Sequence, residues 1–129
     1  MTPPAFVPDG YTLLRPLGSG NTSHVYEARH PNFGAVALKL PKGELARDPV
    51  LRRMFENEVQ MTLLLKHPRV INAFEGCPAG EGAFLALEYC ESTLDQKLAE
   101  RLPLGTAYRL VLDVAQGLLH THQRQLLHR

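Results

Sequence analysis

The 129-residue sequence has no tryptophan, only two cysteines and almost no excess of either charge. Cys77 and Cys90 form neither a C-x-x-C motif nor a dense disulfide framework, so we expect reduced thiols in a cytoplasmic protein. The formal net charge is only +1 and the sequence has no basic stripe, so binding to nucleic acid or to a membrane surface is not indicated. No apolar run approaches the roughly 20 residues that cross a bilayer, and the N-terminus lacks the segments of a signal peptide.

The remaining composition is that of one folded domain. The hydrophobic share is 44% and the charged share 21%, which is typical of globular proteins, and the length is sufficient for a core. Residues 1–10 begin with a proline-rich stretch, and we expect them to form a flexible N-terminal arm. The folded region is therefore expected to begin at Tyr11.

Three segments of strand-like alternation follow the arm. Residues 11–17, 24–29 and 35–40 are separated by short connections rich in Gly, Asn and Pro, which predicts an antiparallel meander. Two more strands are expected at residues 70–75 and 83–89. The sequence therefore predicts a five-stranded antiparallel sheet.

Helical signals come between and after these strands. Asp48-Pro49 has the residue types of an N-cap and a first helical position, and the helix is expected to run to about Lys66, before Pro68. A short helix is expected at 94–102 and a longer one at 106–123. The fold class is therefore α+β, with one large helix packed on the sheet and two helices after it.

Lys39 and Glu58 each place a charge inside an apolar element. Lys39 closes the apolar run 35–40 and shares a strand face with the small Ala37, which leaves room for a flat ligand. Burying an unpaired charge is costly, so we expect the two charges to meet across a sheet–helix contact. The alternatives are a lysine that extends to solvent and a glutamate at the margin of the apolar stripe. That stripe lies at helical offsets from Glu58 and contains Leu51, Met54, Phe55, Thr62 and Leu65.

Gly18-Ser19-Gly20 forms a glycine-rich turn one strand upstream of Lys39. Such a turn allows backbone amides to approach an anion, although a plain hairpin turn has the same composition. The following residues alternate as a strand, which excludes a dinucleotide-binding helix, and no Gly-Lys-Ser/Thr follows, which excludes a Walker loop. The remaining phosphate-binding arrangement is a glycine flap between antiparallel strands.

Taken in order, these motifs resemble those of eukaryotic-type serine/threonine protein kinases. Residues 17–25 resemble the glycine-rich loop, residues 36–39 the third-strand lysine motif and Glu58 the glutamate of helix C. Residues 84–90 resemble the fifth strand and hinge, and His128-Arg129 resembles the start of the catalytic His-Arg-Asp loop. The resemblance extends from Tyr11 to the end of the sequence.

The resemblance implies a kinase N-lobe at residues 11–90, followed at 91–129 by the hinge exit and the first helices of an incomplete C-lobe. It implies ATP with Mg²⁺ as ligand and phosphoryl transfer to protein hydroxyls in the complete family member. Lys39, paired with Glu58, would hold the α- and β-phosphates, Leu87 would guard the back of the pocket, and backbone groups of Glu88 and Cys90 would bind the adenine edge. Leu17, Val25 and Ala37 would enclose the adenine, and Gly18, Ser19, Gly20, Asn21, Thr22 and Ser23 would cover the phosphates.

The sequence departs from the family pattern at two places. Ser23 replaces the third glycine, which makes the flap tip less free to adopt positive φ. The sequence ends before the catalytic Asp, the metal-binding Asn and the Asp-Phe-Gly segment, so the Mg²⁺ ligands are missing. We therefore expect that this polypeptide alone does not transfer phosphate. The alternatives are a natural half-kinase that acts as a nucleotide-binding or scaffolding module and a small-molecule kinase of the aminoglycoside type.

Two further patterns concern metals and partners. His120, His122 and His128 lack a cysteine or carboxylate to complete a ligand set, so no metal site is predicted. The apolar face of 106–123 would be exposed without the rest of a kinase C-lobe, which predicts self-association or docking on another chain. The expected partners are thus ATP, a protein substrate of the full-length kinase, and a second chain bound to the apolar face of 106–123. Nucleic acid and membrane are not expected as partners.

Overall fold

The computed structural model describes residues 4, 6–92, 94–100 and 102–123, which belong to two compact units. Unit 1 consists of Met1–Leu64 and Asn72–Tyr89, and unit 2 consists of Leu65–Ile71 and Cys90–Arg129. Part of the predicted 1–10 arm and the His128-Arg129 motif lie outside the described residues.

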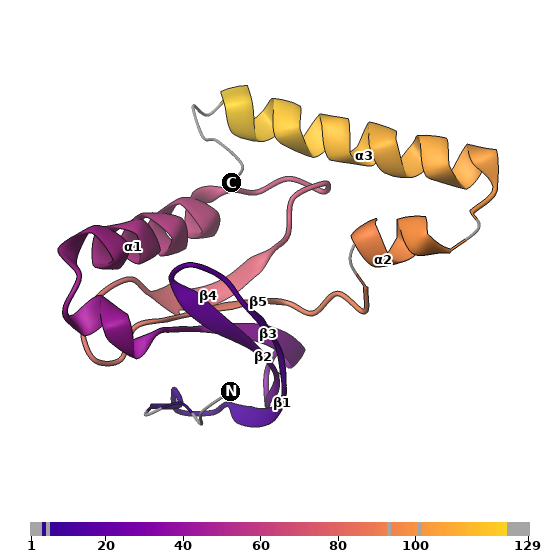
Figure 1. Ribbon diagram of the computed structural model, residues 1–129. Coiled ribbons are helices and arrows are strands. Elements are labelled where there is room, and N and C mark those ends of the chain that lie inside the picture. Colours follow the sequence, from indigo (N-terminus) through magenta and orange to yellow (C-terminus); the bar gives the residue numbers. More distant parts are fainter. Residues whose placement is uncertain (1–3, 5, 93, 101, 124–129) are drawn as a thin grey trace. The chain divides into compact units, whose positions relative to one another are not determined.

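Unit 1 is built on a five-stranded sheet in the order β1-β2-β3-β5-β4, with every neighbouring pair antiparallel (Figure 1). This confirms the predicted number and direction of the strands. The meander of the first three strands is also confirmed, because β2 pairs with β1 on one side and with β3 on the other. The strands are β1 (Thr12–Ser19), β2 (Ser23–His30), β3 (Gly34–Pro41), β4 (Ala73–Cys77) and β5 (Phe84–Glu88).

Helix α1 (Pro49–Leu64) begins at the predicted cap. A side-chain oxygen of Asp48 accepts hydrogen bonds from the backbone N–H groups of Val50 at 3.0 Å and Leu51 at 3.2 Å, so it satisfies two amides of the first turn. The helix ends at Leu64, two residues before the predicted end. It is preceded by a 3₁₀ turn, η1 (Gly43–Ala46), which the sequence did not predict.

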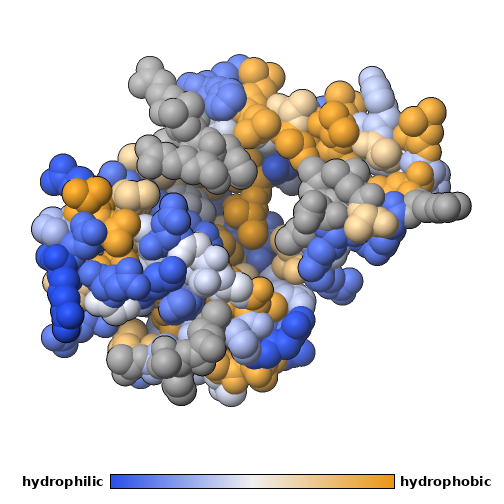
Figure 2. Space-filling model, in the orientation of Figure 1, coloured by the Kyte–Doolittle hydropathy of each residue, from blue (hydrophilic) through white to orange (hydrophobic). Residues whose placement is uncertain are grey.

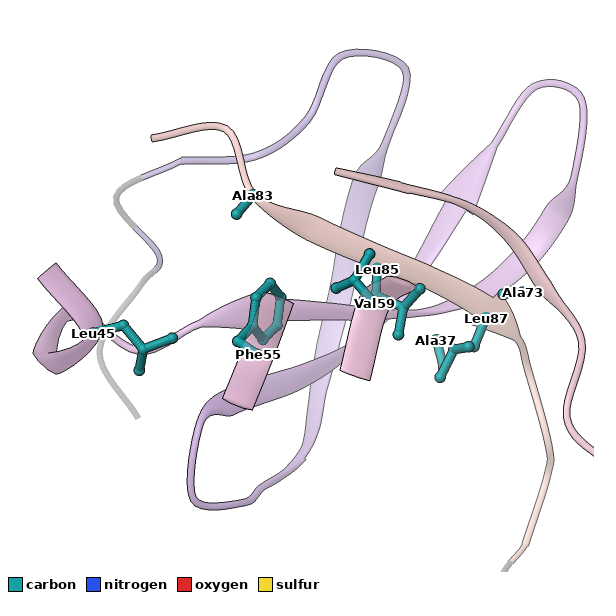
Figure 3. Close-up of a cluster of buried hydrophobic side chains, with 8 residues drawn as sticks. All are labelled: Ala37, Leu45, Phe55, Val59, Ala73, Ala83, Leu85 and Leu87. Carbon is teal, nitrogen blue, oxygen red and sulfur yellow. The ribbon is translucent and has the colours of Figure 1, made fainter. Parts of the chain in front are cut away.

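The sheet of unit 1 has a buried cluster on each face, whereas most residues of β1 are exposed. On one face, Phe55 and Val59 of α1 pack against Leu85 of β5 in a cluster of buried side chains (Figure 3). On the other face, Val36, Leu38 and their neighbours form a second buried cluster, which includes Tyr11 and Tyr26. Successive residues of β3 thus enter different cores, as the alternation of side chains in a strand requires.

Unit 2 contains α2 (Leu94–Ala99) and α3 (Leu104–Gln123), which confirms the two predicted helices. The loop segment Leu65–Ile71 packs against α3. Arg69 lies 3.2 Å from the carboxylate of Asp113 and donates a hydrogen bond to Gln116 at 3.2 Å. A Cβ added at Gly117 would lie 2.5 Å from the carbonyl oxygen of Arg69, so the close approach of the two backbones requires glycine.

Most of the apolar face of α3 is exposed. The exposed fractions are 69% for Tyr108, 61% for Val111 and 59% for Leu119, and Figure 2 shows hydrophobic residues along this helix. Gly117 is the buried residue of the helix. Within the part of the chain that the structure describes, no helix combines the length and the apolar character needed to span a membrane.

Candidate nucleotide-binding site

Lys39 of β3 and Glu58 of α1 form an ion pair at the sheet–helix contact of unit 1. The Lys39 Nζ atom lies 2.5 Å from Glu58 Oε1, and the two side chains are 27% and 32% exposed. The predicted ion pair is therefore present. The partial exposure of both groups leaves the ammonium accessible to a ligand, while the carboxylate restricts its position.

The glycine-rich turn connects β1 with β2. The N–H of Gly20 donates a hydrogen bond to the carbonyl of Ser23 at 2.9 Å, which closes the turn. Residues 18–21 are exposed, whereas Thr22 and Ser23 are buried at 7% and 4% exposure. Thr22 and Ser23 are thus buried residues of the predicted phosphate flap, and their contact with phosphates stays a prediction.

Gly18 and Gly20 contribute open space to this turn. No heavy atom lies within 4 Å of a Cβ built at either position, and neither residue has a positive φ. Their effect is to leave the backbone uncovered, which suits the approach of an anion.

The strand register places the predicted pocket residues on one face. Val25 is paired with Lys39, and Ala37 is paired with Leu87. Paired residues project from the same face of a sheet, so all four share the face that α1 covers. Ala37 and Leu87 are buried at 9% and 6% exposure, and Val25 packs against their cluster. Gly18 is paired with Val25 and so lies in one row with Lys39 across three strands.

The remaining predicted contacts are less closely grouped. Leu17 is 40% exposed and lies at a register irregularity between Pro16 and Gly18. The N–H of Glu88 donates to the carbonyl of Asn72 at 2.9 Å, so this N–H is already engaged within the fold. Cys90 is exposed and belongs to unit 2.

The sequence profile of the protein kinase domain matches residues 11–129 of the chain. The chain belongs to the protein kinase domain family. It is 34% identical over 126 residues to the serine/threonine-protein kinase PknI of Mycobacterium tuberculosis, covering 93% of this chain and 22% of that protein. It is 30% identical over 133 residues to the serine/threonine-protein kinase pkn2 of Myxococcus xanthus, covering 100% of this chain and 16% of that protein.

Solved kinase domains share the fold. The crystal structure of the Mycobacterium tuberculosis PknI kinase domain matches with a TM-score of 0.72 and 32% identity, covering 100% of this chain and 54% of that one. A crystal structure of a single mutant of the same domain matches with a TM-score of 0.70 and 34% identity, covering 100% of this chain and 55% of that one. The present chain therefore spans about half of a solved kinase domain and about a fifth of its curated relatives.

This kinase-family chain also has a cluster of polar contacts around Arg15 that the sequence did not predict. Arg15 of β1 contacts Glu27 of β2 through an Nε–Oε1 distance of 2.6 Å, and its Nη2 donates to the hydroxyl of Tyr89 at 2.9 Å. The hydrogen bonds to Glu27 and Tyr89 raise the pKa of the Arg15 guanidinium, so it remains charged. Opposite charges on adjacent strands were the available signal, but the strand register is needed to pair them.

The described residues of this kinase-family chain hold no group of three or more His, Cys, Asp or Glu side chains that is able to bind a metal ion. The partly exposed ammonium of Lys39 and the uncovered backbone of the glycine turn fit a phosphate group. The site therefore has the residues for binding an anionic nucleotide.

Proposed function

We propose that this chain forms the ATP-binding part of a serine/threonine protein kinase. The observation that carries the proposal is the Lys39–Glu58 ion pair, which is partly exposed on the sheet face beside Ala37. The named relatives are serine/threonine-protein kinases, which favours this function over a half-kinase scaffold or a small-molecule kinase.

The positions of the site residues support the roles proposed for them. Lys39 binds phosphate oxygens as a point charge, and Glu58 prevents the flexible lysine from turning to solvent. The glycine turn presents backbone to the phosphates, and the small Ala37 leaves room for the adenine. A bound nucleotide would supply the phosphoryl group, and its divalent cation would neutralise charge. Leu17, Val25, Leu87 and backbone groups of Glu88 and Cys90 complete the proposed adenine contacts.

Phosphoryl transfer to a protein hydroxyl is proposed for the whole kinase. In the family pattern, the catalytic aspartate and the Mg²⁺ ligands follow His128-Arg129. A polypeptide restricted to residues 1–129 is therefore expected to bind ATP without transferring phosphate. Steady ATP turnover by this pure polypeptide that Lys39→Met abolishes would contradict this expectation.

The binding proposal is tested by titrating Mg-ATP into wild type, Lys39→Ala and a matched control, Lys66→Ala. Lys66 is exposed in unit 2, so its removal changes the net charge equally without touching the ion pair. Loss of a charge-assisted contact of roughly 1.5–3 kcal/mol is expected to weaken binding of Lys39→Ala at least tenfold. Equal affinity of wild type and Lys39→Ala would refute the site assignment.

The remaining partner proposals concern other surfaces. A protein substrate is proposed for the whole kinase, and association of chains is proposed for the apolar face of 106–123, where Val111 and Leu119 are exposed. A concentration-independent monomer mass by light scattering would count against this association. A cytoplasmic location is proposed because the sequence has only two cysteines, which do not form the dense framework of a disulfide-rich secreted domain.

A further inference from the structure

Arg15 connects three segments of unit 1 that are far apart in the sequence. Its guanidinium contacts Glu27, twelve residues away, and the Tyr89 hydroxyl, 74 residues away. Glu27 is the more protected partner, since its side chain is 16% exposed whereas that of Arg15 is 59% exposed. The guanidinium donates to both partners from different nitrogen atoms, which a lysine ammonium is less well shaped to do.

The strand that carries Arg15 is otherwise weakly restrained. β1 is one of the two edge strands of the sheet and is hydrogen-bonded to β2 alone. Its register with β2 is irregular between Leu13 and Arg15 and again between Pro16 and Gly18, so Arg15 lies between two breaks in the ladder. The glycine turn follows directly. A side-chain contact at Arg15 therefore restrains a part of β1 where the backbone pairing is interrupted.

The same contact lies beside the proposed adenine position. Arg15 is paired with Glu27, Glu27 with Ala37 and Ala37 with Leu87, so these four residues form one row across the sheet. The row runs next to the row that contains Gly18 and Lys39. Tyr89 follows Leu87 by two residues, just after β5. The Arg15 contacts thus tie the strand before the glycine turn to the segment after β5.

We propose that Arg15 is a positioning residue that holds β1 and the glycine turn over the nucleotide through Glu27 and Tyr89, and so slows nucleotide release. This inference rests on the proposed function, because it assigns a role in the same nucleotide site. An exposed ion pair adds little to global stability, so the effect is expected in the motion of β1 and in ligand retention.

The experiment uses Arg15→Ala, Tyr89→Phe and the control Arg29→Ala. Tyr89→Phe removes one hydroxyl and preserves every charge. Arg29 is an exposed arginine on β2, so the control removes the same charge at a different site. Hydrogen exchange of the amides of residues 17–20 is measured without ligand, and dissociation of a fluorescent ATP analogue, mant-ATP with Mg²⁺, is measured by stopped flow.

Arg15→Ala and Tyr89→Phe are both expected to accelerate amide exchange in the turn and to increase the dissociation rate about three- to tenfold, as loss of one net hydrogen bond predicts. The midpoint of thermal unfolding should remain close to that of wild type, and Arg29→Ala should behave as wild type. Together these results support a positioning role for Arg15. A contact with a purely structural role would not produce this combination of results.

Two results would overturn the inference. If Arg15→Ala accelerates dissociation but Tyr89→Phe does not, the contact with Tyr89 does not slow nucleotide release, and the proposal that Arg15 acts through both partners is wrong. If exchange in residues 17–20 is unchanged in both variants, Arg15 does not hold the turn. Failure of wild type to bind mant-ATP would refute the proposed function and the effect on nucleotide release, while the exchange data would still decide whether Arg15 restrains β1.

Discussion

The two units of this chain bury their apolar residues to different extents. In unit 1 the sheet has a core on each face, and Phe55, Leu38 and Leu85 are at most 1% exposed. In unit 2, α3 has apolar side chains that remain mostly exposed, with Leu104 at 87% and Tyr108 at 69%. Unit 1 therefore contains the packing that fixes its own site residues, whereas α3 is restrained mainly by the segment that carries Arg69.

This difference has a consequence for the nucleotide site. Lys39 is adjacent in sequence to Leu38 and Leu40, which are buried in the core opposite α1, and Glu58 is adjacent to the buried Val59. Because both charged residues are flanked by packed ones, the ion pair is positioned by unit 1 alone. The following three predictions test the contrast between the units, from the largest effect to the smallest.

Replacing one aromatic residue in each unit gives the largest contrast. Phe55→Ala leaves a cavity between α1 and the sheet and is expected to lower the free energy of unfolding by about 3–5 kcal/mol. Tyr108→Ala on the exposed face of α3 is expected to change it by less than about 0.5 kcal/mol. Urea unfolding monitored by circular dichroism measures both values.

If Phe55→Ala does not fold, Val59→Ala provides the same comparison with a smaller loss of volume, because Val59 is fully buried in the same cluster. Equal losses for the buried and the exposed substitution would show that α3 is packed in solution and that the contrast between the units is wrong.

A pair of glycines in α3 tests how this helix is held. Gly117→Ala places a Cβ 2.5 Å from the carbonyl oxygen of Arg69, and the strain of roughly 1–3 kcal/mol should exceed the helix-propensity gain of about 1 kcal/mol. Gly105→Ala meets no atom within 4 Å and should stabilise the helix slightly. Hydrogen exchange of α3 amides should become faster in the first variant and slower in the second. Slower exchange in both would exclude the close backbone contact.

The hydroxyl of Tyr11 gives the smallest of the three effects. It donates to Glu75 at 2.6 Å, and burial together with this bond raises the pKa of Tyr11 above its ordinary value of about 10. Tyr11→Phe is expected to cost about 1 kcal/mol near neutral pH. A raised pKa in the folded state means that this contribution is complete below pH 10 and decreases as pH rises further, since the unfolded chain ionises first.

Thermal unfolding of wild type and Tyr11→Phe between pH 7 and pH 11 measures this dependence. The stability difference between the two proteins should be constant up to about pH 9 and should become smaller above about pH 10. A difference that grows with pH would mean that the folded state favours the phenolate, in disagreement with the bond to Glu75.

Local signals in the sequence predicted the parts of the fold that depend on neighbouring residues. Asp48-Pro49 located the start of α1 because capping involves the first helical turn only. The alternation around Lys39 and the helical offsets around Glu58 predicted the two faces that meet. The nucleotide roles of these residues stay predictions, since they depend on a ligand.

Features that depend on individual turn and side-chain hydrogen bonds were missed. The strand expected at Val70 begins at Ala73, because the N–H of Val70 closes a turn on the carbonyl of His67. η1 is held by Arg52 of α1, whose side chain donates to the carbonyls of Leu45 at 3.1 Å and Ala46 at 3.2 Å. Neither contact produces a periodic pattern in the sequence that could have predicted it.

The pairing of Arg15 also illustrates this limit. Counting back along an unbroken hairpin from the Ser19–His24 pair would place Arg15 opposite Ala28, but one register irregularity moves it opposite Glu27. A shift of one residue thus decides whether Arg15 meets a methyl group or a carboxylate.

Leu65–Ile71 belongs to unit 2, although in the chain it separates α1 from β4 of unit 1. A single cut in the polypeptide therefore cannot separate the two units intact. Recombination that exchanges consecutive stretches of a gene would transfer one unit together with a fragment of the other. The two units are thus expected to be inherited jointly. Substitutions near Arg69 are expected to constrain those near Gly117, and the reverse.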